Sequence, residues 1–437
     1  MTATQALADI RAGKLTAEQY LAACLERIRE VDEDIQAWAF LDPNHALEQA
    51  RAADARKRLG RPLGPLHGLP VGVKDIIDTA DMPTENGTVL HAGRRPTRDA
   101  TIVSLLRQAG AVIVGKTVTT ELAVYHPGRT RNPHNLEHTP GGSSSGSAAA
   151  VAAGMVPVAL GTQTNGSVIR PASFCGIYGY KPSHGLISRH GVLAQSRPLD
   201  TIGVMAADLE DLALLAEPLM AYDPADPAMR PRARPDLARI LAEDPPLPPK
   251  LAFVRGPTWE HAEEEARAGF AELIGVLGER VGELALPAVF DDAIEQHRRI
   301  MEADLAKSFA AEYQRGAEQL SARLREMIAR GRQVAAVDYN LALERIVRLN
   351  AALAEIFLHY DAIVTPAAPG AAPRGLEATG SPIFCTIWTL CGVPAVTLPL
   401  LSAADGLPIG VQLVGQQGDD ARLLRTARWL VAAARAA

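Results

Sequence analysis

Apolar residues along the chain follow two patterns, one typical of helices and one typical of buried strands. Over residues 1–60 they recur every three or four positions, which predicts helices. Thr16 and Gln19 have the spacing of a capping box at the start of one of these helices. Residues 69–74, LPVGVK, instead form a short valine-rich run, which predicts a buried strand that ends near Lys74.

The same alternation continues over the next part of the chain. Residues 99–110 predict a helix that ends at Gly110, and residues 111–116, AVIVGK, predict a second buried strand. A helix is predicted over residues 147–155 and a strand over residues 156–162. Helices that alternate with buried strands indicate a layered α/β sheet.

The second half of the chain begins with a proline-rich connection at residues 222–250 and continues with a mostly helical stretch at 258–358. Strand patterns return near the C-terminus. We therefore predict an α/β fold in which a single large domain, residues 1–437, has a mixed central β-sheet flanked by helices. Its expected parts are N-terminal helices at 1–60, a core with the catalytic motifs at 61–215, a mostly helical cover at 216–355, and C-terminal core strands and a helix at 356–437.

Composition and charge exclude several classes of function. Apolar residues make up 47% of the chain, and the net charge of −6 is not concentrated in a run of one sign. We therefore expect no nucleic-acid partner. The N-terminus lacks the apolar core of a signal peptide and no stretch is long enough to span a bilayer, so we expect a cytoplasmic protein without a membrane partner. The four cysteines form no CxxC pair, which argues against a zinc site.

Residues 140–147, PGGSSSGS, raise three alternatives: a flexible linker, a phosphate-binding loop or the surroundings of a nucleophile. A linker is disfavoured because the run leads directly into an apolar helix and an apolar strand. The start of a buried helix presents free N–H groups, which suit an anion or a developing oxyanion.

A phosphate-binding loop has one apparent support, because residues 110–117, GAVIVGKT, match the Walker A pattern. The four central positions of that pattern should form a loop with exposed N–H groups. Here they are Ala-Val-Ile-Val, which is a strand sequence, and a helix precedes them. We reject a nucleotide site and expect Lys116 to lie at the surface at the end of a strand.

The third alternative, a nucleophile, has support elsewhere in the chain. Ser167 follows a predicted strand in a glycine turn, and Lys74 at the end of an earlier strand is a possible base. A Ser-His-Asp triad is disfavoured because none of the histidines near the motifs sits in the context of a G-x-S-x-G elbow. The loop histidines near the motifs are expected to be surface or packing residues; they are His126, His134, His138, His184 and His190.

Three stretches resemble the amidase signature family: residues 72–79, GVKDIIDT; residues 140–154, PGGSSSGSAAAVAAG; and residues 161–185, which begin GTQTNGSVIRPASFCG. The 24-residue separation of Ser143 and Ser167 fits the family too. The likeness extends over the whole chain, and its motifs are most similar to those of malonamidase-like members.

The resemblance implies a Ser-cisSer-Lys triad. Ser167 matches the family's nucleophile, Lys74 matches the base, and Ser143 matches the serine that bridges them and follows a cis peptide bond. Spacing alone does not choose among Ser143, Ser144 and Ser145. The implied chemistry passes through an acyl-serine intermediate and requires no metal or organic cofactor.

The resemblance also implies an oxyanion hole made by the backbone N–H groups of Thr164, Asn165, Gly166 and Ser167. Two residues near this hole differ from those common in the family. Gln163 occupies the position of a common aspartate, and Asn165 occupies the position of a common glycine. Asparagine can adopt the left-handed conformation that glycine would use. Its side chain is expected to narrow the acyl pocket or to add a hydrogen-bond donor.

Arg170 and Tyr125 are candidate substrate-binding residues. In malonamidase-like members the matching arginine grips a free carboxylate of the substrate, a task that suits a guanidinium group. The alternative for Arg170 is a structural pair with a nearby acid. Tyr125 lies shortly before the serine run, so it is expected either to line the pocket or only to pack near it.

The resulting prediction is a hydrolase that cleaves a linear amide-type C–N bond of a small molecule and releases ammonia or an amine. Three other acyl substrates fit the same triad, namely carbamates (urethanes), ureido compounds and aryl esters. A different class is an amidotransferase subunit that works with partner chains. A homodimer is compatible with the resemblance.

Overall fold

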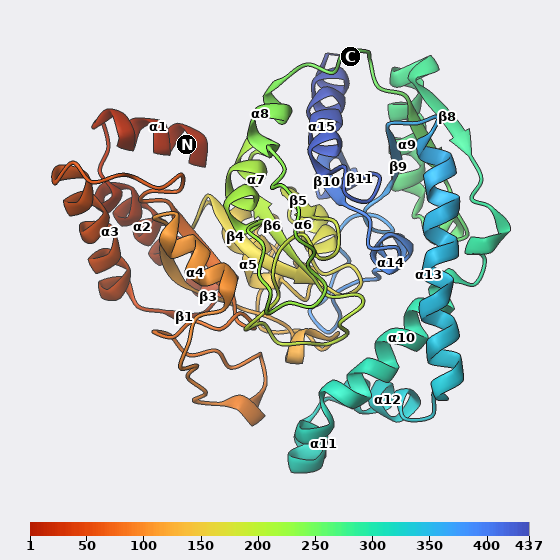
Figure 1. The fold of residues 1–437 in the computed structure, drawn as a ribbon, viewed down its shortest axis with the longest axis horizontal. Coiled ribbons are helices and arrows are strands. Elements are labelled where there is room, and N and C mark those ends of the chain that lie inside the picture. The colour runs from red at the N-terminus through yellow and green to blue at the C-terminus, as the bar shows by residue number, and fades with distance from the viewer. Residues whose placement is uncertain (437) are drawn as a thin grey trace.

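Eleven strands join in one mixed sheet in the computed structural model, which describes residues 1–436 (Figure 1). They are β1 (Trp38–Leu41), β2 (Pro70–Lys74), β3 (Val112–Thr117), β4 (Val158–Gln163), β5 (Tyr178–Lys181), β6 (Thr201–Ala206), β7 (Leu251–Val254), β8 (Val281–Leu284), β9 (Ala362–Pro366), β10 (Ala395–Ser402) and β11 (Pro408–Val414). Their order across the sheet is β1-β3-β2-β4-β6-β5-β10-β11-β9-β7-β8. The predicted mixed sheet of a single α/β domain is confirmed.

Helices surround this sheet, and the N-terminal helices and the α10–α13 group lie on opposite sides of the molecule (Figure 1). No helix among residues 1–436 is long and apolar enough to cross a membrane. The helices are α1 (Ala3–Ala12), α2 (Ala17–Ile35), α3 (Pro43–Arg58), α4 (Thr101–Gln108), α5 (Ser145–Ala152), α6 (Ile169–Phe174), α7 (Leu209–Ala216), α8 (Leu237–Ala242), α9 (Glu264–Leu277), α10 (Ala293–Ser308), α11 (Ala310–Gly316), α12 (Ala322–Gly331), α13 (Ala336–Phe357), α14 (Ile383–Leu390) and α15 (Asp420–Arg435).

Both faces of the sheet are buried at its central strands β2, β3 and β4, which explains why these strands have largely apolar sequences. In β3, Val112 and Val114 belong to a core cluster with residues of α2 and α5. Ile113 between them belongs to another cluster, with residues of α4, α7 and α15. Successive residues of a strand point to opposite faces, so one strand contributes to two cores.

Short strands account for the differences between the predicted and observed elements. The expected all-helical N-terminus also contains β1, and the expected helical cover also contains β7 and β8. Each of these three strands has four residues, too few for a clear alternation of apolar and polar positions. They lie at the two ends of the sheet, so their place depends on pairing with distant strands.

The expectation that Lys116 lies at the surface was wrong. Its side chain is fully buried, and Nζ hydrogen-bonds to Ile77 O at 2.8 Å and to Thr84 Oγ1 at 2.6 Å. Asp75 Oδ1 lies 3.4 Å from Nζ, and burial lowers the pKa of Lys116 to about 8. The segment after β2 covers this end of β3, an arrangement that the local sequence does not reveal.

Candidate active site

The site lies where the carboxyl ends of two parallel strands meet. β2 runs parallel to β4, with Val73 opposite Leu160, so Lys74 at the end of β2 lies close to Thr162 near the end of β4. Lys74 Nζ lies 2.9 Å from Thr162 Oγ1 and 2.7 Å from Ser143 Oγ, both within hydrogen-bond distance. The strand register therefore brings the predicted base to the predicted bridging serine.

The three consecutive serines have different contacts. Ser144 Oγ accepts a hydrogen bond from Thr162 N at 3.2 Å, and Ser145 Oγ donates to Val118 O at 3.3 Å. Of the three, only Ser143 reaches Lys74. The peptide bond between Gly142 and Ser143 is cis. The contacts thus distinguish Ser143 from its neighbours, which the spacing of the sequence could not do.

Burial controls the proton affinity of Lys74. The side chain is fully buried, and desolvation of the ammonium form holds the pKa of Lys74 well below its usual value. The negative charge of Asp200 acts in the opposite direction and raises this pKa. Because desolvation is the larger effect, Lys74 is suited to the neutral state, in which an amine can accept a proton.

Ser167 lies in the turn between β4 and α6. Its side chain is half-buried and borders a small cavity, whose other lining residues are Ala123, Val124, Tyr125, Thr164, Asn165, Gln195, Met301 and Leu305. Within residues 1–436, the backbone N–H groups of residues 164–167 donate no hydrogen bond. Free N–H groups beside a hydroxyl at a cavity are the arrangement that an oxyanion requires.

Gln163 holds this turn in place, a role that the sequence did not suggest. Its Oε1 accepts hydrogen bonds from Val168 N at 2.8 Å and from Ile169 N at 3.0 Å. Its Nε2 donates to Thr389 Oγ1 at 2.9 Å. The side chain thus satisfies N–H groups at the start of α6, as a carboxylate would, and adds a donor that a carboxylate lacks.

Asn165 and Tyr125 form one wall of the cavity. Asn165 Nδ2 donates to the Tyr125 hydroxyl oxygen at 3.0 Å, and Asn165 Oδ1 accepts from Thr386 Oγ1 at 2.8 Å. Asn165 is not among the residues with positive φ, so it does not use the left-handed conformation considered for it. A Cβ added to Gly166 would lie 2.8 Å from Pro382 Cβ, so this position needs glycine for the close approach of α14.

Arg170 is fully buried and donates to main-chain oxygens. Its Nη1 donates to Gly380 O at 2.7 Å, and its Nη2 donates to Gly142 O at 2.6 Å and to Thr379 Oγ1 at 3.2 Å. No acid within residues 1–436 pairs with it, so the suggested ion pair is wrong: the partners are carbonyl and hydroxyl groups. Arg170 links the segment before Ser143 to the segment before α14.

We expect Arg170→Met to lower the free energy of unfolding by about 2 kcal/mol, because two buried carbonyl groups lose a charged donor while the apolar stem is kept. Denaturant titration of both proteins measures this difference. Arg170→Lys is the control: it retains one charged donor and should recover part of the loss. An unchanged free energy of unfolding in Arg170→Met would contradict the linking role.

His297 on α10 is a site residue that sequence reasoning missed. Its Nε2 lies 2.9 Å from Thr164 O, and its side chain is buried. Burial lowers the pKa of His297 to about 4, so the ring is neutral and donates from Nε2 to the carbonyl. A lone histidine on a long helix gives no signal of this contact, because Thr164 is 133 residues away.

The pKa of His297 predicts how stability depends on pH. Between about pH 6.5 and about pH 4 the unfolded chain binds a proton at this position and the folded chain does not, so the stability that His297 contributes is lost as pH falls. Relative to His297→Gln, the wild type should lose up to roughly 3 kcal/mol over this range. Unfolding of both proteins across the range measures it, and parallel curves would contradict it.

A wider cavity continues outward from the small one and shares Tyr125, Asn165 and Met301 with it. Its remaining walls come from α10, α12 and the start of α14. They are Ile294, His297, Arg298, Glu302, Arg323, Met327, Arg330, Ser381, Pro382, Ile383 and Thr386. The end of β2 thus holds Lys74 against Ser143 in the loop before α5, while the helices form most of the approach to Ser167.

Comparison with known proteins indicates the family of this chain. A family model described as amidase matches residues 19–424. The A subunit of glutamyl-tRNA(Gln) amidotransferase from Chloroflexus aggregans is 36% identical, over 97% of this chain and 94% of that protein. The solved structure of native peptide amidase from Stenotrophomonas maltophilia is 30% identical, with a TM-score of 0.86, and the match covers 100% of this chain and 97% of that one.

A further solved structure, from a vestigial protein complex described as revealing the evolutionary origins of an s-triazine catabolic enzyme, is 26% identical, with a TM-score of 0.92 over 99% of this chain and 98% of that one. These relatives support the amidase signature family without indicating its malonamidase-like members in particular. The chain belongs to the amidase family, and it is an amide-hydrolysing enzyme.

Proposed function

We propose that the chain hydrolyses a linear amide-type C–N bond of a small molecule through an acyl intermediate on Ser167. The observation that carries the proposal is the contact of 2.7 Å between Lys74 Nζ and Ser143 Oγ, in surroundings that disfavour the charged form of Lys74. A neutral amine beside a serine relay is the base that this reaction needs at neutral pH.

In the proposed acylation step, Ser167 Oγ attacks the substrate carbonyl carbon. Its proton passes to Ser143 Oγ, while the proton of Ser143 passes to Lys74 Nζ. The N–H groups of residues 164–167 stabilise the negative charge on the carbonyl oxygen. The C–N bond then breaks, and the proton returns through Ser143 to the leaving nitrogen, which departs as ammonia or an amine.

Deacylation uses the same groups with water in place of the serine. Water gives a proton to the relay and attacks the acyl carbon, and the bond to Ser167 Oγ breaks as that oxygen takes the proton back. The products are a carboxylic acid and the free enzyme. Water is the only co-reactant that these two steps consume.

The class of substrate is tested with a panel in which the amides, carbamates and ureido compounds share one leaving amine and the aryl esters share the acyl group of the amides. Amide hydrolysis with a higher kcat/KM than carbamate hydrolysis supports the main proposal. A preference for carbamates would instead favour the urethane-hydrolysing alternative with the same triad.

A second candidate function is that of an amidotransferase subunit, and the observation that favours it is the 36% identity to the glutamyl-tRNA(Gln) amidotransferase protein of Chloroflexus aggregans. In that case the chain would pass the released ammonia to partner chains. Turnover of simple amides by the purified chain alone separates the two functions. Activity that appears only after partner chains are added would support the amidotransferase.

A malonamidase-like specificity and a homodimer belong to the same proposal. If Arg170 grips a substrate carboxylate, Arg170→Ala should lower kcat/KM for malonamate-like substrates much more than for neutral amides. Both of its Nη groups already have protein acceptors, so equal loss on both substrates would assign it the linking role alone. The mass of the purified chain in solution tests the dimer.

A further inference from the structure

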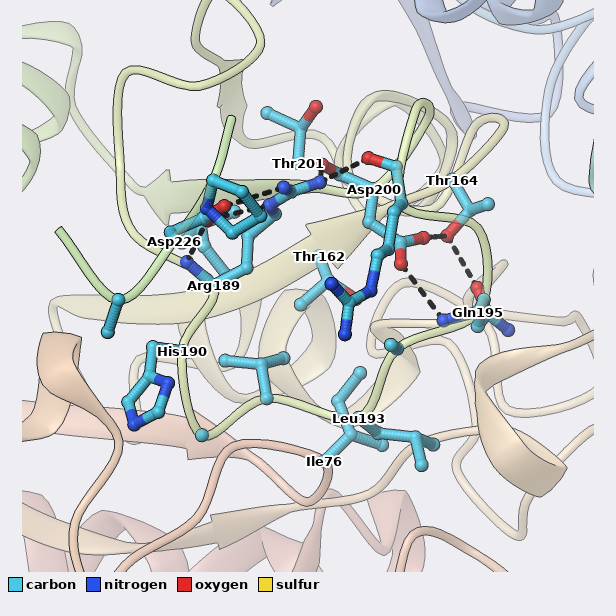
Figure 2. Close-up of a pocket in the computed structure, with 17 residues that line it drawn as sticks. Ile76, Thr162, Thr164, Arg189, His190, Leu193, Gln195, Asp200, Thr201 and Asp226 are labelled. Carbon is cyan, nitrogen blue, oxygen red and sulfur yellow. Dashed lines mark hydrogen bonds and ion pairs between the residues drawn. The ribbon is translucent and has the colours of Figure 1, made fainter. Parts of the chain in front are cut away.

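Asp200 lies beside the proposed oxyanion turn, although neither the relay nor the hole uses it. It directly precedes β6, which pairs with β4 so that Thr201 lies opposite Gln163. This register puts Asp200 next to Thr164. A cavity on this side of the site is lined by Asp200, by Thr164 and by Thr162, which contacts Lys74 (Figure 2).

Short contacts surround the carboxyl group of Asp200 (Figure 2). Asp200 Oδ2 accepts hydrogen bonds from Gln195 N at 2.9 Å and from Ser196 N at 3.0 Å. Thr164 Oγ1 lies 2.6 Å from Asp200 Oδ1 and 2.5 Å from Gln195 Oε1. The orientation of the Gln195 amide is fixed, because its Nε2 donates to Leu122 O at 2.8 Å.

These contacts require two protons where Thr164 supplies one. A hydroxyl group donates a single hydrogen bond, and the amide oxygen of Gln195 carries no proton. With Asp200 ionised, one of the two contacts at Thr164 Oγ1 would bring lone pairs together at hydrogen-bond distance. With Asp200 protonated, Oδ1–H donates to Thr164 Oγ1, and the Thr164 hydroxyl donates to Gln195 Oε1.

We propose that Asp200 is a positioning residue that acts as a neutral carboxylic acid, fixing Thr164 at the oxyanion turn and leaving Lys74 without a counter-charge. This inference rests on the proposed role of Lys74 as the base. Lys74 and Asp200 would carry one proton between them, and the reactive arrangement has it on Asp200. Moving it to Lys74 would create an ammonium–carboxylate pair that cannot accept a proton from Ser143.

The electrostatics of the pair agree with the contacts. Burial raises the pKa of Asp200 to about 6, despite the donors around it. The pKa of Lys74 is lowered by burial, and the negative charge of Asp200 opposes this effect. Neutral Asp200 therefore favours neutral Lys74, so the two groups titrate as a coupled pair.

Other charged groups also face this cavity. Arg189 ion-pairs with Asp226 at 2.8 Å, and Arg197 and His190 line the cavity as well. Arg189 lowers the pKa of Asp200, although its Nη1 contacts the Asp200 main-chain oxygen and not the carboxyl group. These groups remain in every variant of the test, so they do not account for a difference between the variants.

Asp200→Asn and Asp200→Ala together test the proposal. Asparagine has the shape and the charge of the neutral acid and a permanent N–H donor toward Thr164, so we expect Asp200→Asn to keep kcat/KM within about threefold of wild type and the acid limb of its pH profile in place. Asp200→Ala has no donor and should lower kcat/KM by roughly tenfold. If Asp200→Asn loses as much kcat/KM as Asp200→Ala, or if its acid limb moves lower as it would on removal of a carboxylate charge, the proposal is overturned.

An infrared difference spectrum of wild type minus Asp200→Asn measures the protonation of Asp200 without depending on catalytic turnover. We expect a carboxylic-acid C=O band throughout the pH range in which kcat/KM is at its plateau, because the contacts at Thr164 Oγ1 require the proton on Asp200. If Asp200→Asn does not fold, the difference spectrum of wild type minus Asp200→Ala isolates the same band. Asp200 that is ionised across this plateau, as a normal aspartate would be, would overturn the proposal. Failure of the proposed function is distinguishable, because wild type would then form no adduct with a fluorophosphonate.

Discussion

Ser167→Ala is expected to lower kcat by about 10⁴-fold or more, because it removes the only atom proposed to bond to the acyl group. A fluorophosphonate should add one covalent label to the wild type, visible in the intact mass, and none to the variant. Ser167 is half-buried and borders the cavity, so part of the residue is accessible from outside the core. The change removes one oxygen, and we expect the fold to be retained.

Ser144→Ala is the matched control for this experiment. It removes a serine hydroxyl from the same region, one that contacts β4 and not Lys74. Labelling should persist in this variant even if its stability falls. A label that survives in Ser167→Ala would contradict the assignment of the nucleophile and would direct attention to the other serines.

Lys74→Met is expected to lower kcat/KM by about 10³-fold or more, because Ser143 then has no base to receive its proton. The same substitution should raise the free energy of unfolding. The folded pKa of Lys74 lies well below its unfolded value, so between the two values only the unfolded chain holds this proton, and burial of the amine destabilises the fold. Hydrolysis rates and denaturant titrations measure the two effects.

The destabilisation has a predictable dependence on pH. As pH rises toward the ordinary lysine pKa, the unfolded chain gives up its proton, and the difference in stability between wild type and Lys74→Met should shrink. A Lys74→Met protein that is both inactive and less stable than wild type would indicate a structural lysine. Retained hydrolysis would contradict its role as the base.

The sequence allowed the central strands and the candidate triad to be predicted for different reasons. β2, β3 and β4 are buried on both faces, so each is a continuous apolar run between glycines or prolines. The triad came from a resemblance, since no physical rule separates Ser143 from Ser144. The structure adds the register that brings Lys74 to Ser143, which are 69 residues apart.

The residues that were missed depend on contacts between distant segments. His297 meets Thr164 only because α10 packs over the turn, and Asp200 meets it only because β6 pairs with β4. Lys116 was misplaced for the same reason, since its cover comes from the segment after β2. Local pattern carries no information about such pairs, because each depends on how the chain crosses the sheet.

The division of the site between strands and helices has a consequence for how this enzyme can diverge. Strand ends carry Lys74 and Thr162, while Met301 and Leu305 on α10 and Thr386 on α14 form walls. Substitutions on the helices change the shape offered to a substrate and leave the reacting groups in place. Selection, in nature or in a library limited to residues 290–330 with His297 retained, can therefore alter substrate range without rebuilding the chemistry.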